Sequence, residues 1–450
     1  MNTRIILKLA SAGMVLAAHG HAAAVTAEEA GQLKSTLTPL GAEKAGNKDG
    51  SIPAWDGGYT KAIPAANGRR GDPFKDEKPI LTITAKNADQ YAGRLTEGTL
   101  AMLKKYPETY RVEVYPTHRT AVAPAWVVEN TFKNATRAKI ANGIPSGAYG
   151  GIPFPIPKSG AEVMYNHLLR WRGSSMQWEF SHYQVTADGR MVLTSDGSLD
   201  LQNPYYLEGG SPEEFDKRGE YYMIHLRTQA PAIRAGEQVI GRDNIDGELS
   251  QGWVYLTGQR RVRKLPNPCC DLPAAATAGL MLTDELEVWT GRLSRFDWKL
   301  VGKKEMYIPY NTNKILNVKN DQELLTKNHL NPDVLRWELH RVYVVDATLK
   351  GGQRHQVSKS RYYCDEDTWH CVLADRWDGN GQLWRSLWYL TQVMPDLQAT
   401  TGTTFGYYDL LSGTAFLAND MAMKKKQYRP VPRFQDTNFT PESMSAEGAR

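Results

Sequence analysis

After Tyr110 the chain is a succession of runs rich in β-branched and aromatic residues, separated by short polar turns. The turns carry dipeptides that adopt a positive φ easily and favour tight hairpins. These dipeptides are Asp188-Gly189, Asp196-Gly197, Asp246-Gly247, Gly351-Gly352 and Asp378-Gly379. The pattern is typical of a meander, and it predicts an antiparallel β-sheet.

The segment Leu335–Leu349 is the most informative about that sheet. Its odd-numbered positions are mostly apolar, whereas its even-numbered positions include Glu338 and His340. Such an alternation is expected of an antiparallel sheet that is covered on one side only. A strand of this length also indicates a strongly bent sheet. Further strands are expected at Val357–Cys364, Trp369–Trp377 and Gly381–Leu390. We therefore expect a half-barrel whose concave face something must fill.

Helical patterns are confined to a few short segments. We expect helices at Ala27–Leu37, Ala88–Tyr106, Ala161–Trp171 and Asp321–Asn328. Prolines at 53, 64, 73 and 79 forbid a continuous strand near the N-terminus, so this part should wrap the main domain as an irregular arm. The expected fold class is mainly β with helices (α+β), with an arm at 25–109, a half-barrel sheet domain at 110–420 and a tail at 421–450.

The first residues, 1–24, have the features of an export signal. Arg4 and Lys8 supply positive charge, Leu9–Ala18 is an apolar run, and small residues follow at 22–24. The apolar run is about half the roughly 20 residues that a membrane-spanning helix needs. We expect cleavage near Ala22 to Ala24 and a periplasmic location.

Composition limits the partners of the mature chain. Charged residues make up 23% of the sequence, as in an ordinary globular protein. The formal net charge of +5 includes Arg4 and Lys8 of the expected signal, so the mature excess is smaller. An excess this small does not indicate a nucleic-acid partner.

Four cysteines in an exported chain suggest disulfides. Cys269 and Cys270 are adjacent, and adjacent cysteines bridge only through a strained ring. We expect either a bond between Cys364 and Cys371, which flank an acidic turn, or links from the Cys269-Cys270 loop to that turn. A zinc site made of the four thiols is the alternative, although the spacing matches no paired zinc ribbon.

The sequence carries none of the common catalytic motifs: no nucleophile elbow, phosphate loop, dinucleotide fingerprint or paired-histidine metal helix. His340 and His355 could converge from neighbouring strands, but scattered polar-face histidines are the simpler interpretation. Asp375–Gly381 superficially resembles a calcium loop without its distal glutamate, so we interpret it as a turn. The acids before Trp289, at 284, 285 and 287, are expected to be solvated. We expect no metal, no cofactor and no enzyme activity.

One stretch combines aromatic and basic residues. Trp253 and Tyr255 share a strand face, and Arg261 and Arg263 share a face after the turn, next to Arg260. Arginine binds carboxylates and phosphates through paired hydrogen bonds, so this stretch could hold an anionic lipid head group. The alternative is a salt bridge between strands, with Asp297 as the acidic partner.

Several stretches of the chain together form a pattern that spans most of the mature sequence: Gly46-Asn47, Ile52–Trp55, Gly58, Gly258–Pro266, Ser294–Tyr310, His329–Asp333, Trp337–Val342, Tyr362-Tyr363 and Gly381–Arg385. This pattern resembles the proteobacterial family known as domain of unknown function 1329. It implies an exported protein with a fold similar to that of the lipoprotein carriers LolA and LolB, a half-open antiparallel barrel with helices plugging its hollow side. The chain departs from the family pattern at Cys269-Cys270.

The resemblance also implies partners. The family is associated with transporters of the resistance-nodulation-division type and with an outer-membrane barrel family, which implies handling of lipids or other hydrophobic molecules.

Three functions follow as hypotheses. The first is a periplasmic binding or carrier protein for a lipid-like molecule. Its candidate pocket wall is Trp253, Tyr255, Trp337, Leu339, Tyr343, Trp384 and Trp388. The second is an interaction protein that docks on transport machinery through its arm or the basic run Lys424–Lys426. The third is an envelope hydrolase, for which the acids to test are Asp297, Glu338, Asp375 and Asp378.

Overall fold

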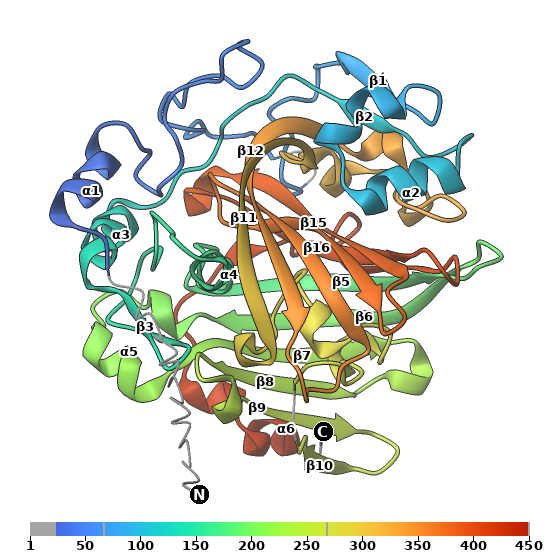
Figure 1. The fold of residues 1–450 in the computed structure, drawn as a ribbon. Coiled ribbons are helices and arrows are strands. Elements are labelled where there is room, and N and C mark those ends of the chain that lie inside the picture. The colour runs from blue at the N-terminus through green and yellow to red at the C-terminus, as the bar shows by residue number, and fades with distance from the viewer. Residues whose placement is uncertain (1–23, 66–67, 267–268, 449–450) are drawn as a thin grey trace, which may run out of the picture.

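The computed structural model describes residues 24–65, 68–266 and 269–448. Apart from Ala24, the expected signal peptide lies outside the described residues. The molecule is built on one 16-stranded sheet with the order β1-β2-β12-β13-β14-β15-β16-β17-β5-β6-β7-β8-β9-β10, in which β11 also pairs with β12 and β18 with β5. Figure 1 shows that this sheet is strongly curved and does not close. The predicted fold class, mainly β with a curved half-open sheet, is confirmed.

The strands that form the sheet are β1 (Leu81–Ile83), β2 (Val112–Val114), β5 (Ser175–Val185), β6 (Met191–Gln202), β7 (Glu220–Ala230), β8 (Gln238–Asn244), β9 (Gln251–Leu256), β10 (Arg261–Lys264), β11 (Phe296–Pro309), β12 (Trp337–Leu349), β13 (Val357–Asp365), β14 (Cys371–Asp378), β15 (Leu383–Met394), β16 (Ala399–Asp409), β17 (Ala415–Asp420) and β18 (Arg429–Pro430). A separate hairpin joins β3 (Lys139–Ala141) to β4 (Ile144–Ser146). Pairing within the main sheet is antiparallel except where Trp337 of β12 meets Val114 of β2 in parallel.

The helices are α1 (Ala27–Gly31), α2 (Glu97–Lys105), α3 (Ala125–Arg137), α4 (Gly160–Leu168), α5 (Pro212–Arg218) and α6 (Pro441–Gly448). Helix α4 lies in the hollow of the sheet against β11 and β12, whereas α2 packs on β14 and β15 and α6 on β9 and β10 (Figure 1). A capping box in which Ser159 and Glu162 bond each other's backbone amides fixes the start of α4. Within the described residues, no helix is both long and apolar enough to cross a bilayer.

The predicted turns are mostly correct. Asp188-Gly189, Gly351-Gly352 and Asp378-Gly379 join consecutive strands, and Asp246-Gly247 lies between β8 and β9. Asp196-Gly197 was predicted as a turn, which is wrong, because it lies inside β6 where the register with β7 shifts. A Cβ at Gly197 would lie 1.9 Å from the carbonyl oxygen of Arg227, so glycine is needed there for close approach of the two strands.

The predicted helices are shorter than expected, and three helices, α3, α5 and α6, were missed. The segment 27–37 holds α1 and a 3-10 turn, 88–106 is broken at Leu95 into a 3-10 helix and α2, and 321–328 holds only the turn Asp321–Glu323. Helix α3 was not predicted. Its buried positions are Val127, Thr131, Asn134 and Ala135, which include too few large apolar side chains to give an apolar stripe.

The expectation of a sheet covered on one side only is wrong for strand β12. Both of its faces are buried between Trp337 and Val345. Glu338 accepts hydrogen bonds from the amide of His118 at 2.9 Å and from Asn311 Nδ2 at 3.0 Å, and it pairs with Arg336. Buried polar groups need such partners, so the segment after β2 can cover the polar face of the strand.

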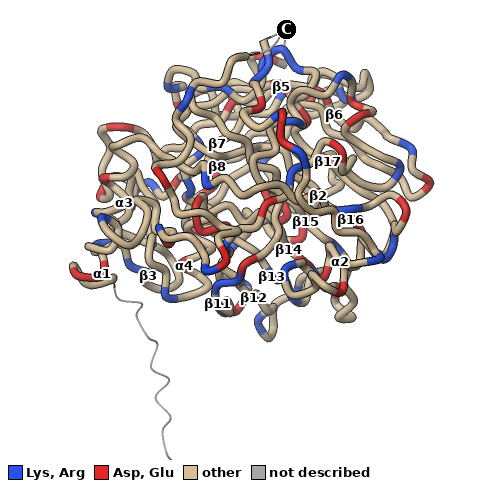
Figure 2. Tube along the Cα trace, turned by 90° about the horizontal axis from the view of Figure 1, so that it is seen from above, with Lys and Arg blue, Asp and Glu red and all other residues tan. Residues whose placement is uncertain are grey.

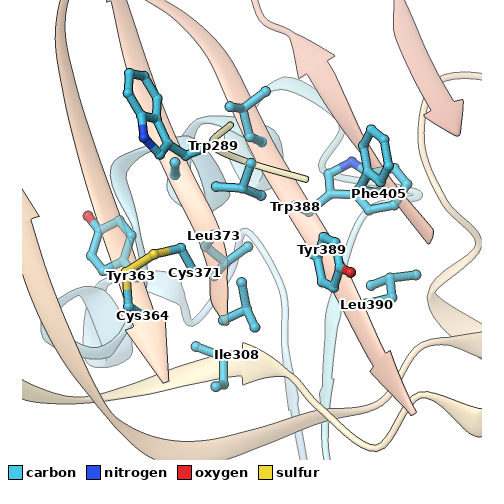
Figure 3. Packing of buried hydrophobic residues seen from close by; sticks show 14 of the residues in the cluster. Trp289, Ile308, Tyr363, Cys364, Cys371, Leu373, Trp388, Tyr389, Leu390 and Phe405 are labelled. Atoms are coloured by element: carbon cyan, nitrogen blue, oxygen red, sulfur yellow. A yellow bond between two sulfur atoms is a disulfide. The ribbon is translucent and has the colours of Figure 1, made fainter. Parts of the chain in front are cut away.

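The cysteines are paired as two disulfides in the described part of the chain. Cys364 bonds Cys371 between β13 and β14, which is one of the two arrangements expected from the sequence. Figure 3 shows this bond among the buried residues of the core. Cys269 and Cys270 are bonded to each other, so the expected link from their loop to the acidic turn is absent.

Charges are distributed over the whole molecule. Figure 2 shows Lys and Arg interspersed with Asp and Glu, without a continuous basic stripe. Lys424 pairs with Asp196, and Lys426 lies 4.0 Å from Glu179, so the basic run before β18 is held against the sheet. The residues at 25–109 and after 420 both pack on the sheet, and the division into arm, domain and tail stays a prediction.

Candidate functional site

A cavity of about 410 Å³ lies on the concave side of the sheet. Its floor is formed by β6, β7 and β8, and its roof by the residues 269–293, which we call the cap segment. Apolar side chains from both surfaces line it, among them Leu199, Ile224, Leu226, Val239 and Leu286. The hollow reaches the surface beside Leu272, which also lines it and is 46% exposed.

Strand register explains why these side chains share one face. Leu226 is the partner of Leu199 on β6 and of Val239 on β8, so the three form a row across the floor. Ile224 opposes Gly241 in the next row, where the missing side chain leaves room above the sheet. Ile224 and Val239 are apolar yet only half-buried. The concave face therefore holds apolar surface that the protein's own elements leave uncovered.

The opposite face of the same strands is filled. Met223 and Ile240 pack there with Tyr255 of β9, and the C-terminal residues Phe439 and Met444 cover them. Met223, Ile240, Phe439 and Met444 have no exposed surface. Among the described residues of these strands, the space for a ligand therefore lies on the concave side.

Acidic residues anchor the cap segment to the sheet. Asp284 pairs with Arg376 at 2.9 Å and with His355 at 3.0 Å, and Glu285 pairs with Arg385. Burial alone would raise the pKa of Asp284, but the charge of Arg376 and the hydrogen bond from His355 hold it below the usual range. The prediction that this acidic cluster is solvated is wrong, because inward arginines on β14 and β15 neutralise it inside the protein.

A second set of charges closes the inner end of the cavity. Glu287 pairs with Arg170 and Arg172, and the hydroxyl of Tyr222 donates to it at 2.9 Å. Burial opposes ionisation of Glu287, but the two arginines hold its pKa below the ordinary value. The carboxylate is therefore charged and fully partnered.

Asp243 is different from the other carboxylates that line the cavity. Glu287 is paired as above, Glu248 pairs with Arg292, and Asp246 accepts the amide of Glu248 at 3.1 Å. Asp243 lies on β8, opposite Tyr222 of β7, and faces the hollow. No described residue donates a hydrogen bond to the Asp243 carboxylate or forms an ion pair with it. Burial raises the pKa of Asp243 to about 7, against the opposing effect of Arg172.

The structure places the seven candidate wall residues outside the lining of this cavity. Trp253 and Tyr255 lie on the convex face beside α6, because the alternation along β9 directs Gly252 into the hollow instead. Trp253 also carries Lys264 over its ring at 5.7 Å.

The remaining five are packed elsewhere. Trp337, Leu339, Tyr343 and Trp388 are buried core residues, and Tyr343 stacks on Trp369. Trp384 is half-buried, and its indole donates to Asp409 at 2.8 Å. A role for these residues in binding stays a prediction.

The basic strand β10 lies at the edge of the sheet. Arg260, Arg261 and Arg263 are exposed there, and Asp297 is exposed at the start of β11. In the described part of the chain no ion pair joins these arginines to Asp297. Both the head-group role and the expected salt bridge therefore lack support from a contact.

A buried cluster offers ligand atoms suited to a metal. Such atoms of His340, Asp365 and Asp367 lie within 4.8 Å of one another. Each is already engaged: Asp367 accepts two hydrogen bonds from Arg119, Asp365 accepts from Thr368, and His340 lies 3.0 Å from Glu338. Arg119 also donates to the carbonyl oxygen of Glu43 at 2.7 Å, so we interpret the cluster as a charge network that joins the arm to the sheet.

The acids considered for hydrolysis are dispersed. Glu338 lies at the beginning of β12, whereas Asp297 is the partner of Thr348 near its end. Glu338 and Asp375 are fully buried, and Asp378 follows Asp375 at a turn. His340 and His355 also stay apart, each beside its own carboxylate.

These features define a class of protein: a curved, unclosed β-sheet whose hollow side carries helix α4, a capping loop and an apolar cavity of ligand size. The chain belongs to the family described as "Protein of unknown function (DUF1329)", whose model matches residues 82–445. This confirms the family resemblance inferred from the sequence.

The chain is also similar to a curated protein and to solved structures. The chain is 39% identical in sequence to "Uncharacterized protein PA3922" of Pseudomonas aeruginosa. This match covers 100% of this chain and 99% of the other protein. A DUF1329 family protein from Desulfovibrio piger matches 60% of this chain and 92% of its own, with 14% identity and a TM-score of 0.42. A putative outer membrane lipoprotein-sorting protein domain from Vibrio parahaemolyticus matches 64% of this chain and 98% of its own, with 11% identity and a TM-score of 0.43.

Proposed function

We propose that this protein is a periplasmic binding or carrier protein for a lipid or another hydrophobic molecule. The observation that carries the proposal is the cavity between β6–β8 and the cap segment, where Ile224 and Val239 stay half-buried. Its volume of about 410 Å³ lies in the range of sites for small molecules. Burial of each methylene contributes about 0.8 kcal/mol, so a chain of about ten carbons gives useful affinity after the costs of association.

The partners proposed with this function are a transporter of the resistance-nodulation-division type or an outer-membrane barrel. A carrier that exchanges cargo with them needs an opening to its site, and Leu272 lies at such an opening.

The two alternative functions, a docking protein and a hydrolase, have less support. Lys424 and Lys426, proposed for docking, are engaged by acids of the sheet. The acids considered for hydrolysis do not gather at the cavity.

Titration of the mature protein with the hydrophobic fluorophore 1-N-phenylnaphthylamine tests the proposal. We expect saturable binding of one dye per chain and displacement of the dye by dodecanol. Lipid extraction after purification without detergent should also recover an aliphatic molecule. A protein that neither enhances dye fluorescence saturably nor carries any extractable lipid would contradict the proposed function.

A further inference from the structure

We propose that Asp243 binds the polar end of the ligand, and that this end is a hydrogen-bond donor, an amine or a hydroxyl, and not an anion. The inference rests on the proposed function and narrows its substrate class. Its basis is the position of Asp243: the carboxylate faces the apolar hollow and receives no hydrogen bond or ion pair from the described residues.

The surroundings of Asp243 argue against an internal partner. The charge of Arg172 acts on Asp243, but Arg172 pairs with Glu287 and lies over the ring of Tyr222 at 4.4 Å. Asp243 is half-buried, and a ligand that covers it removes its remaining water; a carboxylate left without a donor in that state costs about 1–3 kcal/mol. A ligand that supplies the donor recovers this free energy on binding.

The cavity also disfavours anionic ligands. Four acids line it: Asp243, Asp246, Glu248 and Glu287. Among the described lining residues the arginine is Arg292, and its charge is balanced because it pairs with Glu248. A fatty acid or phosphate would place a second negative charge beside Asp243 in a poorly solvated space. A long-chain amine would instead form a charge-assisted hydrogen bond, and an alcohol a neutral one.

The experiment compares three ligands of equal chain length. Dodecylamine, dodecanol and dodecanoate are titrated against the dye-loaded mature protein at pH 8. We expect dodecylamine to bind at least about tenfold more tightly than dodecanoate, with dodecanol between them. Asp243→Asn should abolish most of this preference, whereas Asp297→Asn, which changes an exposed acid on β11, should preserve it.

A measurement on the wild-type protein covers the case in which Asp243→Asn does not fold. Lowering the pH from 8 to 6 protonates Asp243, whose pKa is raised to about 7, while dodecylamine stays a cation. The other titratable or charged groups facing Asp243 are Arg172, Glu287, Tyr221 and Tyr222. Burial raises the pKa of both tyrosines, so none of the four groups changes its protonation between pH 8 and pH 6. Binding of dodecylamine should therefore weaken several-fold at pH 6 and that of dodecanol should not.

The outcomes separate the two proposals. If none of the three ligands displaces the dye, the proposed function itself fails. If all three bind with equal affinity at pH 8, or if Asp243→Asn keeps the preference for the amine, the hydrophobic site stands and the role of Asp243 is wrong.

Discussion

Filling the cavity from its floor should block binding without unfolding the protein. Val239 is half-buried on β8, lines the hollow, and has Leu226 as its partner on β7. In Val239→Trp the indole extends into space that is otherwise open to a ligand. The substitution lies on the face away from α6, so the packing of Phe439 and Met444 is not disturbed.

The size of the effect follows from the volume taken. Tryptophan adds about seven non-hydrogen atoms to valine, which displace on the order of five methylenes of a bound chain. At about 0.8 kcal/mol for each methylene, the loss is about 4 kcal/mol, or roughly a thousandfold in Kd. Because the new ring fills a hollow and breaks no polar contact, the free energy of unfolding should change by less than about 1 kcal/mol.

Displacement of 1-N-phenylnaphthylamine by dodecanol measures the change, and urea unfolding measures stability. Val192→Trp is the matched control, because Val192 lies on β6 and is 42% exposed at the surface. It should bind dodecanol within twofold of the wild-type protein. A Val239→Trp variant that unfolds like the wild type and still binds dodecanol with wild-type affinity would refute the reasoning.

Three further predictions concern the scaffold. Glu287→Gln leaves two buried arginines without a carboxylate and should lower the free energy of unfolding at pH 7 by about 3 kcal/mol, measured in urea. Since the folded protein lowers the pKa of Glu287 below 4.5, this difference should be complete above that pH and shrink as the pH falls further. Phe439→Ala, at a fully buried position on the convex side, should cost about 3 kcal/mol in thermal unfolding yet leave dodecanol affinity unchanged. Replacing both Cys364 and Cys371 by serine should cost about 2 kcal/mol, whereas an unchanged stability would show that the short closed loop contributes nothing.

Local alternation was enough to predict the class of fold. Turn dipeptides between apolar runs marked the hairpins, and the length of the strand at 335–349 indicated a bent sheet, as observed in β12. The same alternation could not reveal what covers each face. The polar side of β12 is buried by residues more than 200 positions earlier in the chain, His118 among them, and no local pattern encodes such a contact.

The sequence also did not predict which residues form the candidate site. Trp253 and Tyr255 were selected because aromatic residues dominate binding surfaces, but Gly252 is the β9 residue that lines the hollow. Likewise the acids at 284–287 looked like a solvated loop, since their arginine partners lie far away along the chain. A possible signal was Asp243 itself, a lone acid between Ile240 and Ile245 at the end of a strand.

Diffraction from crystals is the sharpest test of whether an aliphatic ligand occupies the cavity under the cap segment. Crystals of the mature protein grown with 12-bromododecanol reveal the position of the bromine by its anomalous signal. We expect one bromine between β6–β8 and the cap segment, with the hydroxyl beside Asp243. A bromine bound elsewhere, for example beside Trp337 or Trp388, or a ligand-free cavity in crystals of protein that binds the alcohol in solution, would contradict it.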